Sequence, residues 1–206
     1  MAARLWAASQ THHDQVQQTP FVVALAGQRL PWRAYADWLA QLYLLHESLA
    51  QVEALLADPS EAPASSRSAR VSLPALAADL RFLHGEFWQR HLIARSATTV
   101  YCTHLREIAA GNAVGLLAHH YARHIEDLYA ATTLTPAVTA AYGLDDAGRQ
   151  FLCPTDTDLW QYLDSFQRLV DTLSFGETEH DAMLGQIGQV QYTYLDILDD
   201  LGRSWS

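Results

Sequence analysis

The stretch LLAHHYARHIEDLYAATTL, residues 116–134, places titratable side chains at helical spacing. His120, His124 and Asp127 follow one another at intervals of four and three residues, and Arg123 precedes Asp127 by four. Residues three or four apart lie on the same face of an α-helix, so we expect these groups to form one stripe. Apolar residues fill the other side of the segment. It therefore predicts an amphipathic helix, whether the stripe faces solvent or a binding site.

Helical periodicity continues on both sides of this stretch. Residues 31–58 predict one long core helix with Pro31 in its first turn, followed by a loop rich in Ala, Ser and Pro up to Arg70. A shorter helix is expected near the N-terminus, and further helices at residues 72–83, 98–110, 114–132, 158–173 and 178–201. No alternating pattern typical of strands competes with them. The sequence therefore predicts an all-α fold, a single multihelical domain spanning residues 1–206.

The segment from Leu134 to Thr157 breaks this periodicity. It contains two prolines and two glycines, Pro136, Gly143, Gly148 and Pro154. Both residue types interrupt helices, so we expect this segment to be irregular and to wrap the outside of the bundle.

Composition excludes several classes of function. The formal net charge of −10 argues against nucleic-acid binding, which depends on Lys and Arg neutralising phosphates. No stretch approaches the roughly 20 apolar residues that a membrane span needs, and the N-terminus lacks a signal-peptide pattern. Cys102 and Cys153 are the only cysteines, and their settings favour free thiols in a reducing compartment. We therefore expect a cytoplasmic protein with no membrane partner.

The quoted segment resembles the distal helix of the haem oxygenase family, whose pattern is close to AHxYxRYLGDLSGGQ. The residues that match in register are Ala118, His119, Tyr121, Arg123, Asp127 and Leu128. The resemblance covers most of the chain. His13, then Phe21 and Arg29-Leu30, match the family's N-terminal pattern. Weaker matches follow at Ala75-Leu76, Asp79-Leu80, Phe82, Gly85, Trp88-Gln89, Tyr101, Leu105 and Glu107.

This resemblance implies a haem held between a proximal and a distal helix. His13 would ligate the haem iron from the proximal side, as imidazoles commonly do, and its spacing to Phe21 favours it over the neighbouring His12. Asp127 would hold the distal water network with Arg123 in support, and Tyr121 would lie near the propionates. In the family, haem is both substrate and cofactor, and it is cleaved to biliverdin, carbon monoxide and iron. The reaction requires O2 and an external electron donor, a reductase or a ferredoxin.

The distal motif departs from the family pattern at four positions. Glu126 replaces a glycine that lies almost against the haem, and Ala130 and Ala131 replace two further glycines. Each added side chain stands where the backbone should approach the porphyrin closely. Tyr129 stands where the family has a small serine. The basic residues that hold the propionates are also replaced, at Trp6, Leu163 and Gln167.

Two alternatives to a haem oxygenase remain open. The first is a protein of the same fold that binds or sequesters haem without opening the ring, which the loss of the distal glycines favours. The second is a non-haem di-iron oxidase, because imidazoles and carboxylates on facing helices suit such a site. Its candidate ligands are His46 and Glu53 on one helix and His120, His124 and Asp127 on another.

Overall fold

The computed structural model is an all-α bundle and describes residues 2–54, 66–108, 113–153, 159–172 and 176–205. Within these ranges every regular element is helical, which confirms the predicted fold class. The helices are α1 (Ala2–Gln18), α2 (Pro20–Ala26), α3 (Trp32–Ala54), α4 (Ser66–His84), α5 (Ser96–Ile108), α6 (Ala113–Tyr142), α7 (Leu159–Thr172) and α8 (Glu177–Trp205), with two 3₁₀ turns, η1 (Trp88–His91) and η2 (Gln150–Leu152).

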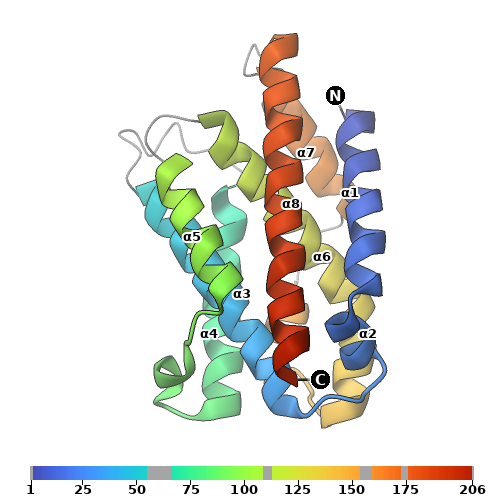
Figure 1. The fold of residues 1–206 in the computed structure, drawn as a ribbon, viewed down its shortest axis with the longest axis vertical. Helices are drawn as coiled ribbons and strands as arrows, with labels where there is room; N and C mark the ends of the chain where they lie inside the picture. Colours follow the sequence, from blue (N-terminus) through green and yellow to red (C-terminus); the bar gives the residue numbers. More distant parts are fainter. Residues whose placement is uncertain (1, 55–65, 109–112, 154–158, 173–175, 206) are drawn as a thin grey trace.

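Helix α3 lies in the core, because apolar side chains cover most of its surface. Tyr35, Trp38 and Leu39 are almost completely buried in its first half, as are Leu42 and Leu49 further along. The helix packs against α4, α5, α6 and α8. Figure 1 shows α8 running along the bundle, with α1 on one side and α3 with α5 on the other. No described helix is long and apolar enough to cross a membrane.

A break at Thr19 separates α1 from α2. The Thr19 hydroxyl accepts a hydrogen bond from Val22 N at 3.4 Å, and Pro20 follows as the first residue of α2. This is the usual combination at a helix N-terminus, since it satisfies a backbone N–H that has no partner within the helix. Phe21 and Leu25 then anchor α2 in the core. Helix α1 consequently runs alongside α6 and α8.

Helix α6 is longer than the sequence predicts. Residues 134–142, expected to be irregular, continue the helix through Pro136 to Tyr142. Leu134 and Val138, four residues apart, are both buried, whereas Pro136 is exposed. The packing of these apolar side chains outweighs the local preference of proline to interrupt a helix. The predicted loop before Arg70 is also partly wrong: residues 66–70 already belong to α4, and residues 55–65 lie outside the described part of the chain.

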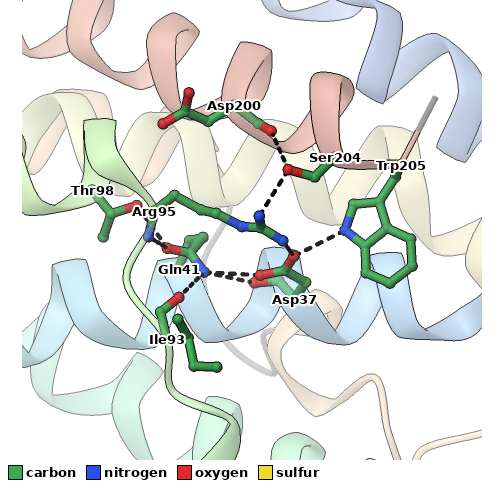
Figure 2. Close-up of polar contacts among 8 residues, drawn as sticks. All are labelled: Asp37, Gln41, Ile93, Arg95, Thr98, Asp200, Ser204 and Trp205. Carbon is green, nitrogen blue, oxygen red and sulfur yellow. Dashed lines mark hydrogen bonds and ion pairs between the residues drawn. The ribbon is translucent and has the colours of Figure 1, made fainter.

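A polar network joins the start of α3 to α5 and the end of α8 (Figure 2). The Gln41 amide donates to Ile93 O at 3.1 Å, and its oxygen accepts from Arg95 N at 2.9 Å. Asp37 forms an ion pair with Arg95 and accepts a hydrogen bond from Trp205 Nε1 at 2.9 Å. We call these residues, with Thr98, Asp200 and Ser204, the α8 anchor. It holds three segments that are far apart in the sequence.

Candidate functional site

The polar stripe of α6 is buried in the bundle. Exposed fractions are 0% for His120, 2% for Arg123, 4% for Glu126 and 7% for Asp127, while His124 is partly buried. The interpretation of this stripe as a solvated face is therefore wrong. Helix α6 packs against α1 and also against α3, so its polar groups meet two different neighbours.

One group of these residues lines a cavity bounded by α1, α2 and α6, with Trp38 of α3 and Tyr194 of α8 also in its wall. His13 lies on one wall and Glu126, Tyr129 and Ala130 lie on another, and the enclosed volume between them is about 10 Å³. That volume holds about one water molecule, so the surrounding side chains must move before a ligand the size of a porphyrin can enter. The structure thus brings the predicted proximal histidine and the predicted distal turn to the same cavity.

His13 has the properties of an available ligand. Burial lowers the pKa of its imidazole below the usual value, which favours the neutral form that binds metals. Its Nδ1 is buried and has no hydrogen-bond partner among the described residues. The ring of Tyr129 stacks on it with 3.8 Å between centroids and 15° between planes. Gln10 of α1 contacts the Tyr129 hydroxyl, so Tyr129 stands against the imidazole inside the cavity.

A second pair, His12 and Glu126, lies next to this cavity. Their Nε2 and Oε1 atoms are 3.4 Å apart, and both side chains are buried. Burial lowers the pKa of His12 to about 3 and raises the pKa of Glu126 to about 8. Both groups are therefore mostly neutral near pH 7. Glu126 faces a histidine of α1 that the family pattern does not mark.

On its other side, α6 meets α3 through imidazole–carboxylate pairs. His46 Nε2 lies 2.9 Å from Asp127 Oδ2, and His120 Nε2 lies 2.5 Å from Glu53 Oε1. Arg123 donates to Asp127 Oδ1 from Nε at 3.3 Å and Nη2 at 3.1 Å. Burial alone would raise the pKa of Asp127, but His46 and Arg123 outweigh it and hold that pKa below its usual value. We call His46, Glu53, His120, His124 and Asp127 the α3–α6 cluster.

The predicted site residues therefore separate into groups. His13, Glu126 and Ala130 share the cavity, whereas Asp127 and Arg123 belong to the α3–α6 side. Tyr121 is buried, with its hydroxyl 3.1 Å from Ser9 Oγ and its ring against Phe166 of α7. Ala131 is only partly buried and does not line the cavity.

Three positions replace the basic residues that hold the haem propionates in the family, and the structure describes the side chain of one of them. Trp6 is partly buried against the core, while the side chains of Leu163 and Gln167 lie outside the described residues. The weakened propionate clamp therefore stays a prediction.

Two residues of the site were missed or underrated in the sequence. His12 was set aside as a competitor of His13, yet it is the buried partner of Glu126. A carboxylate at a family glycine position was the signal, because a buried acid needs a partner. Tyr129 was noted only for its size, and the structure places it directly on the His13 ring.

Comparison with known proteins places these features in a family context. The family model "Heme oxygenase" matches residues 1–190. A heme oxygenase from Takifugu rubripes is 27% identical over 117 residues, which cover 56% of this chain and 42% of that protein. Heme oxygenase 2 from Synechocystis is 22% identical over 209 residues, covering 98% of this chain and 82% of that protein. Over the first two curated relatives, the match spans about half of their length.

Solved structures show the same fold. Heme oxygenase-1 from Synechocystis, crystallised in complex with heme, superposes with a TM-score of 0.83 at 19% identity, covering 97% of this chain and 91% of that one. Heme oxygenase from Leptospira interrogans gives a TM-score of 0.79 at 22% identity, covering 96% and 97%. These similarities confirm the predicted helical architecture over nearly the whole chain.

Proposed function

Because this chain belongs to the haem oxygenase family, we propose that it is one helical domain that binds haem between α1 and α6 and opens the ring to biliverdin, carbon monoxide and iron. The observation that carries the proposal is the cavity lined by both His13 and the α6 turn at Glu126 and Ala130. We further propose that it works in the cytoplasm with O2 and with electrons from a reductase or ferredoxin.

The fit of haem to this cavity depends on two residues. The neutral, partly buried imidazole of His13 suits an axial ligand of haem iron. Tyr129 rests on that imidazole, so its ring must move aside before a porphyrin reaches it. Ala130 adds a methyl group to the opposite wall, and Ala131 adds one further along the same turn. When bound, haem supplies the iron centre at which dioxygen is activated, as cofactors generally carry such chemistry.

The chain's own residues would control water and protons around the ring. We assign to Asp127 the role of holding a distal water, because Arg123 and His46 keep its carboxylate ionised inside the bundle. Arg123 is the positioning residue that orients Asp127. Glu126, protonated near pH 7, lies neutral beside His12 and so brings no negative charge to the cavity. The Tyr121 hydroxyl lies 3.1 Å from Ser9 Oγ of α1, and we assign to Tyr121 a place near the haem propionates.

Hemin titration of the purified protein tests His13 as the ligand. We expect a Soret band typical of histidine ligation, and we expect His13→Ala to abolish or markedly shift it because the axial nitrogen is lost. His84→Ala, which removes a half-exposed imidazole on α4, is the matched control and should leave the band in place. A spectrum that His13→Ala leaves unaltered would rule out the proximal assignment.

A second candidate function is haem binding without ring opening. The stacking of Tyr129 on His13 favours it, because a bulky side chain then limits the space that dioxygen needs above the haem. Adding a reductant under air separates the two functions. An enzyme loses the Soret band and yields biliverdin and carbon monoxide, whereas a binding protein keeps the band. Glu126→Gly and Tyr129→Ser, which restore family side-chain sizes, should raise turnover or tighten hemin binding.

A further inference from the structure

The contact between His12 and Glu126 lies between two separate spaces in the structure. Glu126 lines the small cavity at His13, and among the described residues that line this cavity it is the only one with a carboxyl group. His12 lines a different space, a groove of about 380 Å³ between α1 and α8, the two helices that lie side by side in Figure 1. We call it the α1–α8 groove. The His12–Glu126 pair therefore forms part of the wall between this groove and the cavity.

The α1–α8 groove is open to solvent. Thr11 and Gln15 of α1 and Tyr192 of α8 line it, and all three are exposed. A Cβ atom built on Gly188 would meet no other atom within 4 Å, so no side chain fills the α8 side of the groove. The groove has room for several water molecules. It therefore brings water to the buried ring of His12.

His12 and Glu126 are free to pass a proton between them. His12 Nε2 and Glu126 Oε1 lie 3.4 Å apart, and neither atom has a hydrogen-bond partner among the described residues. A movement of about 0.5 Å brings the two atoms to the usual length of an N–H···O hydrogen bond. Buried donors and acceptors that stay unsatisfied cost free energy, which favours this movement. The family pattern has a glycine in place of Glu126, which offers no such group.

Glu126 also has a proton to give. Burial raises the pKa of its carboxyl to about 8, against the opposing charge of Arg123. Most Glu126 side chains are therefore protonated near pH 7. Asp127 faces His46 and does not line the cavity. Glu126 is thus the acid placed directly at the cavity.

We propose that His12 and Glu126 form a proton relay that supplies the haem cavity from water in the α1–α8 groove. The inference rests on the proposed function, because the reduction of O2 during ring opening consumes protons. Glu126 releases its carboxyl proton into the cavity and takes the Nε2 proton of His12, while His12 Nδ1 takes up a proton from water in the groove. One proton enters for each that leaves, so both residues are neutral before and after the transfer, and the imidazole changes only its tautomer.

Hydrogen–deuterium exchange in the haem-free protein tests the relay. The infrared C=O band of a protonated carboxyl shifts when deuterium replaces its proton, and loss of the band in Glu126→Gln assigns it. We expect exchange within the mixing time in the native chain. His12→Phe keeps a flat ring that cannot carry a proton, so exchange at Glu126 should slow at least about tenfold because it then needs local opening of the fold. Exchange at the native rate in His12→Phe overturns the relay.

Gly188→Leu tests the groove without altering the pair. The leucine extends into the open space at Gly188 and displaces water from the groove, so exchange at Glu126 should again slow about tenfold. Gly185→Leu is the matched control, because Gly185 is an exposed glycine of α8 with equally open surroundings and does not line the groove. Exchange at the native rate in Gly188→Leu, or equal slowing in Gly185→Leu, overturns the proposal.

Turnover gives a second measurement and separates the relay from the proposed function. With hemin, a reductant and air, Gly188→Leu should form biliverdin about tenfold more slowly than Gly185→Leu. Hemin affinity should stay within about twofold in both variants, because neither glycine lines the cavity. Equal turnover in the two variants overturns the relay. A native chain that binds hemin without opening it overturns the proposed enzyme, whereas native-rate exchange in the variants overturns the relay and leaves hemin binding by His13 in place.

Glu126→Gly does not serve as a test of the relay. It removes the carboxyl but leaves space in which water can lie between His12 and the cavity, and that water can carry the proton instead. The increase in turnover expected for Glu126→Gly is therefore consistent with a relay in the native chain.

Discussion

Helix α3 carries two polar networks that differ in how they are satisfied. At its start, Asp37 and Gln41 of the α8 anchor bind main-chain groups as well as side chains, including Ile93 O and Arg95 N (Figure 2). Further along the helix, His46 and Glu53 form ion pairs with Asp127 and His120 of α6. The first network joins segments of the fold, while the second concentrates titratable groups. Buried polar groups that do not serve the main chain are therefore the better candidates for function.

The largest effect is expected where a buried charge loses its partner. Arg123→Met leaves Asp127 buried without its guanidinium, and breaking such a pair typically lowers the free energy of unfolding by about 3–5 kcal/mol. Urea denaturation measures the change. Arg168→Met is the control, because Arg168 and Asp164 form the same four-residue pair on exposed α7, where such pairs contribute about 0–1 kcal/mol. Similar losses in both variants would show that the α6 pair is not buried in solution.

A smaller effect is expected in the α8 anchor. Asp37→Ala removes the acceptor of Trp205 Nε1 and the ion-pair partner of Arg95, so the free energy of unfolding should fall by about 2–3 kcal/mol. Hemin affinity should stay within about twofold, because no residue of the α8 anchor lines the His13 cavity. Asp199→Ala, an exposed carboxylate on α8, is the control for charge. Loss of hemin binding in Asp37→Ala would contradict the division into two networks.

The sequence predicts where the helices lie along the chain better than it predicts which helices pack against each other. Apolar residues at three- and four-residue spacing located α3 and α6, because burial of an amphipathic face imposes that period. The polar stripe could not be assigned to solvent or to the core from its own pattern. Asp127 meets His46, and His120 meets Glu53, only because α3 and α6 pack antiparallel. The seven-residue spacing on both helices was the available signal, and the structure confirms that it brings the four residues together.

Contacts between single residues of the cavity were also harder to predict than the helices that carry them. His13 and the α6 turn around Asp127 were predicted to share one cavity, and the structure brings His13 together with Glu126 and Ala130 there, whereas Asp127 faces His46 instead. The partner of Glu126 was not predicted, since His12 lies on another helix and the choice between adjacent histidines depends on the rotation of α1. The extension of α6 beyond Leu134 was also missed, because local proline chemistry suggested a break that tertiary packing overrides.

The smallest effect is expected at Asp79, a buried carboxyl that serves the main chain like the α8 anchor. It accepts hydrogen bonds from Gln150 N at 2.8 Å and Phe151 N at 2.9 Å, and burial raises its pKa to about 6. Between pH 4 and 6 the unfolded chain therefore binds fewer protons at this residue than the folded chain, so its contribution to stability falls as the pH rises. Asp79→Asn should remove this dependence, which amounts to about 1–2 kcal/mol across the window. Urea denaturation of the native chain and of Asp79→Asn at several pH values measures this dependence. Parallel pH profiles of the two proteins would show that the Asp79 carboxyl is solvated and has an ordinary pKa, against this prediction.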